Sequence, residues 1–83
     1  MPQVLRLFGY RVVIYFNDHR PGHVHVIGNG CEAVFDLNCP KGPSNLRENS
    51  RFTYRELVKI KYELSKNLLT ICRRWKEIHG TYT

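Results

Sequence analysis

The sequence predicts a small α+β domain in which a four-stranded antiparallel β-meander packs on one long C-terminal α-helix, in the order ββββα. Short β-rich runs separated by turn residues fill the first half of the chain, and apolar residues at helical spacing fill the second. The 83 residues are too few for a second hydrophobic core. We therefore expect a single domain over residues 1–83, with the meander over 1–37, a loop over 38–52 and the helix over 53–79.

The first predicted hairpin joins two apolar runs, over residues 4–8 and 11–16. Gly9-Tyr10 stands between them, and its glycine reaches the positive φ that a tight hairpin turn needs. The next segment, 17–22, consists of Asn, Asp, His, Arg, Pro and Gly. This composition is typical of a turn rather than of a strand.

The second predicted hairpin joins residues 23–27 to residues 31–37, and its turn fixes the register. Asn29-Gly30 is the strongest two-residue hairpin signal in the chain. A two-residue loop there aligns Gly28 with Cys31. The pairs that follow are Val26 with Ala33 and Val24 with Phe35 on one face, and Ile27 with Glu32, His25 with Val34 and His23 with Asp36 on the other.

The predicted helix begins at a capping box, because Thr53 and Glu56 stand three residues apart before an apolar pattern. Gly80 supplies its C-terminal stop, and a break near residues 65–67 stays open. Apolar residues then recur at steps of three and four: Leu57, Ile60, Leu64, Leu68, Ile71, Trp75 and Ile78.

The two faces of the predicted sheet follow from aligning Ile14 with Val24 and Tyr15 with His23, which matches apolar residues across the middle of the sheet. The face expected to form the core under the helix carries Leu5, Leu7, Val12, Ile14, Phe16, Val24, Val26, Ala33, Phe35 and Leu37. The face expected to stay open carries Arg6, Arg11, Tyr15, His23, His25, Glu32 and Asp36, among Val13, Ile27 and Val34.

The net charge favours a polyanionic partner. Thirteen Lys and Arg residues against seven Asp and Glu residues give +6 and a sequence pI near 9.6. Such a balance suits RNA, DNA or an acidic protein. The longest apolar run, over residues 12–16, is too short to cross a bilayer, so no membrane partner is expected.

The cysteine pattern indicates a reducing environment. The chain holds three cysteines and no CxxC pair. An odd count without paired spacing argues against a disulfide framework and against a four-cysteine zinc site. We therefore expect a cytoplasmic protein.

The densest chemical cluster is Asp18-His19, Pro21, His23 and His25. An HxH pair on a strand places two imidazoles on the same side, roughly 7 Å apart. Such a pair can transfer protons at neutral pH, with Asp36 across the sheet holding the His23 tautomer. No metal or other cofactor is favoured. Were a metal present, His19, His23 and His25 are the expected ligands. Alternatively, His23 and His25 are ordinary exposed strand residues with no chemical role.

Basic and aromatic side chains beside this pair suggest phosphodiester chemistry. Arg6 and Arg11 are expected to bind phosphate, with Arg20 in the turn nearby, and Tyr15 can stack on a base or donate a proton. With His23, His25 and Asp36 they would form the catalytic surface of a metal-independent ribonuclease.

One run of residues carries a resemblance to a known family: Asn17-Asp18-His19, Pro21 and His23-Val24-His25-Val26, followed by Glu32-Ala33 and Phe35. The sequence resembles the uncharacterised bacterial and archaeal proteins catalogued as domain of unknown function 4160. The opening Met1-Pro2, the Gly9-Tyr10 turn and the late Trp75 fit as well. It departs from the family at Gly22, where a further proline is common, and in its long loop over residues 39–51.

The resemblance implies a small, stand-alone protein, often encoded beside another small protein, for which toxin–antitoxin pairing is suspected. It implies no catalytic residue, since neither a reaction nor a ligand set is established for the family. The function expected is therefore a toxin-like module of a two-protein operon that binds or acts on RNA through the open sheet face, with a small antitoxin-like protein as its partner. One alternative is a non-catalytic docking module sensitive at Val13, Ile27 and Val34. The other is a metal-binding accessory protein.

Overall fold

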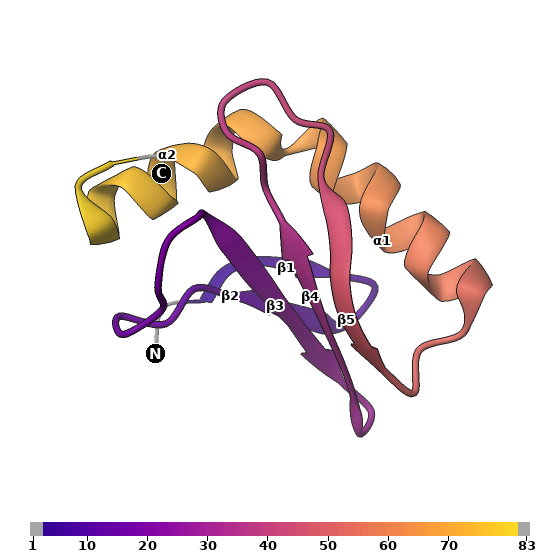
Figure 1. The fold of residues 1–83 in the computed structure, drawn as a ribbon. Coiled ribbons are helices and arrows are strands. Elements are labelled where there is room, and N and C mark those ends of the chain that lie inside the picture. Colours follow the sequence, from indigo (N-terminus) through magenta and orange to yellow (C-terminus); the bar gives the residue numbers. More distant parts are fainter. Residues whose placement is uncertain (1–2, 82–83) are drawn as a thin grey trace.

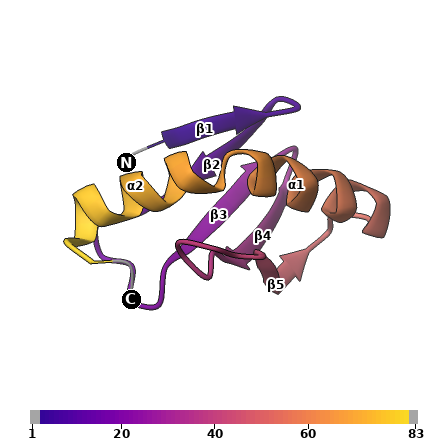
Figure 2. The same ribbon diagram turned by 90° about the horizontal axis from the view of Figure 1, so that it is seen from above.

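The computed structural model describes residues 3–81 and contains a five-stranded antiparallel sheet followed by two helices (Figure 1). The strands pair in sequence order, and the two helices follow one another across one face of the sheet (Figure 2). The elements are β1 (Gln3–Leu7), β2 (Tyr10–Val13), β3 (His23–Gly28), β4 (Cys31–Asp36), β5 (Asn45–Ser50), α1 (Tyr54–Lys66) and α2 (Leu68–His79).

The prediction of four strands is wrong, because residues 45–50 form β5 at the edge of the sheet. The sequence of this strand is almost entirely polar, and all six residues are exposed. Its backbone pairs with β4, with Ala33 opposite Asn49 and a register shift between Val34 and Phe35, and its Arg47 side chain pairs with Asp36. An edge strand tolerates charged residues, so hydrophobic periodicity could not reveal it.

The prediction of one long helix is also wrong, because the helix is interrupted at Asn67. The side-chain amide of Asn67 donates a hydrogen bond to the Glu63 carbonyl, 2.8 Å away. An asparagine side chain that bonds to a nearby carbonyl competes with the regular helical pattern. The apolar stripe nevertheless survives the break, since Ile60, Leu64, Leu68, Ile71 and Trp75 are all buried.

The second hairpin has the predicted register. Asn29 and Gly30 both adopt positive φ, as a two-residue hairpin turn of this kind requires. Every cross-strand pair from His23–Asp36 to Gly28–Cys31 is present. Val24 and Val26 consequently face the helices and are fully buried.

The first hairpin turns one residue earlier than predicted, at Phe8-Gly9, so that Leu7 lies opposite Tyr10. The faces are unchanged, because the resulting pairs differ from those expected by two residues, and the side-chain period of a strand is two. β2 ends at Val13, sooner than expected. Phe16 therefore lies beyond the sheet and is 72% exposed, and its assignment to the core is wrong.

A disulfide joins Cys39 to Cys72, contrary to the expectation from the cysteine pattern. The two residues are 33 positions apart, one in the loop before β5 and the other in α2. Such a pairing depends on the tertiary fold and leaves no spacing signal in the sequence. Cys31 is the free thiol. No helix within residues 3–81 has the length and apolar character needed to cross a membrane.

The start of α1 is tied to the sheet by Glu56. The predicted capping box is present: Thr53 N–H donates to Glu56 Oε1, and Glu56 N–H donates to Thr53 Oγ1. The Tyr10 hydroxyl donates to the other carboxylate oxygen, 2.6 Å away. The Thr53 backbone N–H, with smaller help from Tyr10, holds the pKa of Glu56 below its ordinary value.

We expect Phe35→Ala to lower the free energy of unfolding by about 3–5 kcal/mol, because Phe35 is 1% exposed in the core and its removal leaves a cavity. Urea unfolding followed by circular dichroism measures this. Phe16→Ala is the matched control, and its exposed ring predicts a change within about 0.5 kcal/mol. Equal losses of stability in both variants would contradict the face assignment.

We expect Glu56 to make stability depend on acid pH. Because its folded pKa is lowered, ionised Glu56 stabilises the fold above the ordinary glutamate pKa of about 4.3, and this contribution is lost as pH falls through the folded pKa. The Tm of the parent should thus fall more steeply below about pH 4.5 than that of Glu56→Gln. Glu77→Gln, which removes an exposed carboxylate, should keep the parental slope; a Glu56→Gln profile parallel to the parent would rule out this role.

Candidate functional site

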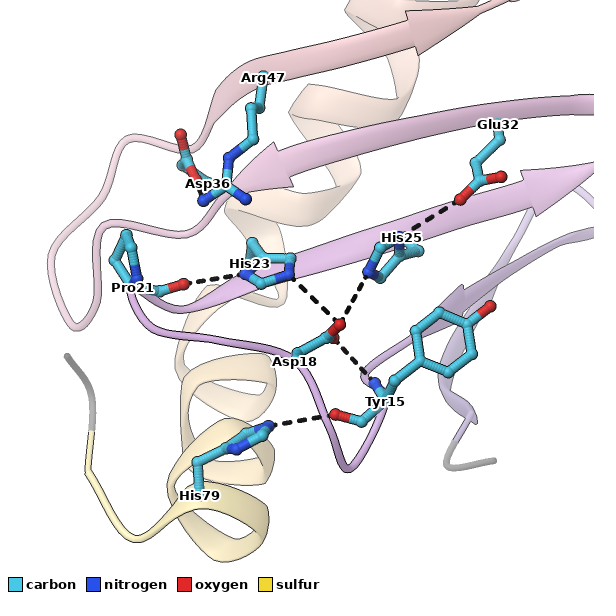
Figure 3. A network of polar contacts seen from close by, with 9 residues as sticks. All are labelled: Tyr15, Asp18, Pro21, His23, His25, Glu32, Asp36, Arg47 and His79. Carbon is cyan, nitrogen blue, oxygen red and sulfur yellow. Dashed lines mark hydrogen bonds and ion pairs between the residues drawn. The ribbon is translucent and has the colours of Figure 1, made fainter.

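The segment between β2 and β3 folds back so that Asp18 lies over two histidines of β3 (Figure 3). Tyr15 N–H donates to Asp18 Oδ2 at 3.0 Å, and Asp18 N–H donates to the Tyr15 carbonyl at 3.2 Å. These two bonds close a tight turn of the kind that aspartate favours. His79, at the end of α2, also donates to the Tyr15 carbonyl through Nε2, at 3.2 Å. The turn is thereby attached to the C-terminal helix.

Three side chains converge beneath this turn, and we call them the Asp–His–His cluster: Asp18, His23 and His25. Asp18 Oδ1 lies 3.5 Å from His23 Nε2 and 3.2 Å from His25 Nε2. The side chains of Asp18, His23 and His25 are only 10%, 7% and 16% exposed. The cluster is therefore largely removed from water while the His25 ring keeps some access to it.

The second ring nitrogen of each histidine is occupied. His23 Nδ1 lies 2.9 Å from the Pro21 carbonyl, which only accepts, so Nδ1 carries the proton in neutral His23 and Nε2 keeps its lone pair. His25 Nδ1 lies 3.3 Å from Glu32 Oε2. Both imidazoles are thus oriented with Nε2 toward Asp18.

Aromatic packing fixes the two rings from the sides. The Tyr15 ring meets the His25 ring edge-on, with centroids 4.8 Å apart, and the two imidazoles meet at 5.3 Å. Trp75 of α2 lies 5.4 Å from His23 and 4.0 Å from His79. α2 therefore contacts the cluster at His23 as well as covering the core.

The structure brings together three of the residues that the sequence suggested as catalytic: Tyr15, His23 and His25 (Figure 3). Asp36 lies opposite His23 in the register but pairs with Arg47 of β5. Its carboxylate is therefore held by an arginine, and Pro21 and Asp18 take the role expected of Asp36. Arg47 could not be anticipated without knowledge of β5.

The predicted phosphate-binding residues divide into two groups. Arg6 and Arg11 pair directly across β1 and β2, and Arg11 also lies opposite Ile27, two residues from His25 on the same face. Arg20 and His19 are exposed in the turn before β3. The three side chains close enough to share an ion are Asp18, His23 and His25, so His19 does not belong to this group.

Sequence reasoning named Asp18 in the turn before β3 and Glu32 on the open face, but it assigned neither of them a role in the site. Asp18 belongs to the same turn-rich motif as the histidines, and a carboxylate there was the available signal. Glu32 was placed opposite Ile27, and its reach along the face to His25 is diagonal.

The open face is less exposed than predicted. Val13 is fully buried and Val34 is 6% exposed, while His23 is 5% exposed. Two of the three apolar residues expected to dock a partner are thus inaccessible. Ile27 is the half-buried member of that set.

Comparison with known proteins assigns a family. Residues 9–76 match the model of a family described as domain of unknown function DUF4160. The chain belongs to the DUF4160 family. The match includes the Asp–His–His cluster and its supporting strands. No curated protein and no solved structure matches the chain.

Proposed function

We propose that the protein is a toxin-like module that binds RNA on the open sheet face and acts on it beside the Asp–His–His cluster. The observation that carries the proposal is the placement of the Arg6–Arg11 pair on the same face as His25. Arginine binds phosphate through two parallel hydrogen bonds. A neighbouring imidazole can act as the general acid or base in cleavage of a phosphodiester.

The open sheet face carries basic residues on one side and acidic residues on the other, and this charge distribution predicts the path of the proposed RNA. Arg6 and Arg11 lie on β1 and β2, whereas Glu32 and Glu48 lie on β4 and β5, where Arg47 is paired with Asp36. A polyanion is attracted to the first side and repelled from the second. RNA should therefore follow β1 and β2, with His25 at the inner border of its path.

His25 is the cluster residue best placed to meet the RNA. Its side chain is the most exposed of the three, at 16%, and it projects from the strand adjacent to β2. The Tyr15 ring beside it offers a surface on which a base can stack. Cation, imidazole and stacking group thus occur together on this side of the sheet.

Replacing both arginines tests the proposal. We expect Arg6→Ala/Arg11→Ala to weaken binding of a single-stranded RNA oligonucleotide and to flatten the slope of log affinity against log salt by about 0.7 for each phosphate that the variant no longer neutralises. Fluorescence anisotropy at several salt concentrations measures both. His25→Ala should stop cleavage of the same oligonucleotide while binding remains.

Arg55→Ala/Arg73→Ala is the matched control, because it removes the same charge from exposed positions on the helices. It should leave binding close to the parental value. If the two double variants weaken RNA binding equally, the binding depends on the net charge of the protein and not on the sheet face. If Arg6→Ala/Arg11→Ala binds as the parent does, the sheet face is not the RNA surface.

A second candidate function, docking of a small antitoxin-like protein, is favoured by a groove between β5 and α1. Its lining includes Leu46, Tyr54, Val58 and Tyr62, which are 45%, 83%, 50% and 64% exposed. Lys61 also lines the groove, and the amino group of Lys66 lies over the Tyr62 ring. Apolar walls with lysines at the rim suit an apolar segment of the partner that carries acidic residues.

The adjacent gene product provides the test of this docking. Co-expressed with the parent it should co-purify, and Val58→Asp should abolish the complex by placing a carboxylate in the groove. Leu69→Asp, at an exposed helical residue outside the groove, should leave the complex intact. Failure to co-purify with the parent, or equal binding by Val58→Asp, rejects the groove as the interface.

A further inference from the structure

We propose that the Asp–His–His cluster is a zinc site, with Asp18 Oδ1, His23 Nε2 and His25 Nε2 as its three protein ligands. The inference deepens the proposed function, since it names a metal for the same site, and its metal-binding test is independent of RNA. Two imidazoles and one carboxylate are ligands that zinc accepts in sites where a coordination position stays open.

The distances fit such a site. The ligand atoms of the cluster all lie within 4.8 Å of one another, and Asp18 Oδ1 lies 3.5 and 3.2 Å from the two imidazole nitrogens. Bonds of about 2.0–2.1 Å to a tetrahedral zinc place neighbouring ligand atoms about 3.4 Å apart. The two distances from Asp18 Oδ1 already match this value, and the remaining pair of ligand atoms, at most 4.8 Å apart, would have to approach on binding.

Each ligand is held from its other side. His23 Nδ1 bonds to the Pro21 carbonyl at 2.9 Å, His25 Nδ1 meets Glu32 Oε2 at 3.3 Å, and Asp18 Oδ2 accepts from Tyr15 N–H at 3.0 Å (Figure 3). In metal sites the histidine nitrogen that does not bind the metal characteristically donates to a carbonyl or carboxylate. Both histidines here have such a partner, and the Asp18 carboxylate is held by the Tyr15 N–H that donates to it.

A cation fits between the members of the cluster when both rings are neutral and donate through Nδ1. With Nδ1 of His23 and His25 donating to Pro21 and Glu32, neutral rings point two lone pairs at the Asp18 carboxylate. Three acceptors facing one another in a largely buried space are unfavourable without a cation. A divalent ion supplies that charge and gives every acceptor a partner.

The ligand types select among cations. Magnesium and calcium prefer oxygen ligands, whereas imidazole suits zinc and its first-row neighbours. The remaining coordination positions would be filled by water or by a phosphate oxygen reaching the cluster past His25. When bound, zinc supplies a Lewis acid beside the proposed RNA path.

Direct titration tests the site. The full chain, with its disulfide kept and metal removed by chelator, is titrated with zinc against a chromophoric chelator. We expect one zinc per chain, and a Kd at least about 100-fold weaker for Asp18→Asn and for His25→Asn. Glu32→Gln should weaken binding by about 10–100-fold, because it loosens a supporting contact only.

Two controls exclude other ligands. His19→Ala removes the exposed histidine next to Asp18, and Cys31→Ser removes the free thiol. Both should bind zinc as the parent does. In the parent, zinc should shift the imidazole NMR signals of His23 and His25 more than those of His19, so the assignment does not depend on the variants folding.

The inference is overturned if the parent takes up no zinc or if Asp18→Asn binds zinc as tightly as the parent does. It is also overturned if His19→Ala weakens zinc binding as much as Asp18→Asn does. These outcomes leave the RNA proposal intact, because RNA binding by the arginine pair is measured in the presence of chelator. Conversely, zinc uptake with unchanged RNA binding by Arg6→Ala/Arg11→Ala retains the metal site and rejects the RNA surface.

Discussion

The alternation of side chains along β3 is the constraint on which the rest of the structure depends. The Asn29-Gly30 turn fixes the register of β3 on β4, and this register sends Val24 and Val26 into the core while His23 and His25 face the other way. A shift by one residue would bury both imidazoles under the helices and expose the valines. The core and the cluster are therefore two results of one pairing, and neither can be changed without the other.

The parts of the fold that follow from local rules were predictable. The β3–β4 register, the Thr53 cap and the apolar stripe of the helices all follow from turn chemistry and periodicity. The first hairpin shows why faces are easier to predict than registers, since a slip of two residues preserved them. β5 was not predictable, because its residues are exposed and almost entirely polar, so that they give no apolar alternation.

The site was predictable only in part, for a related reason. The spacing of His23 and His25 places two imidazoles on one face, and sequence can show this. Which carboxylate meets these two imidazoles depends on how the turn between β2 and β3 folds back over β3. Asp18 reaches both rings because its own turn is closed by Tyr15, while the cross-strand neighbour Asp36 is held by Arg47 from the unpredicted strand. Because β5 was not predicted, neither the number of strands nor the pairing of Asp36 with Arg47 could be predicted.

The C-terminal helix links stability to the site. Trp75 is fully buried, yet its ring also approaches His23 and stacks near His79, which donates to the turn that carries Asp18. The disulfide attaches the same helix to the loop before β5. Changes in α2 should therefore reach the cluster through packing rather than through charge. Arg6 and Arg11 lie on the same face of the sheet as His25, whereas the contact of α2 with the cluster is made by Trp75 at His23. The helix therefore fixes the position of His23, and the proposed RNA contacts would fall on the side of the sheet that α2 does not touch.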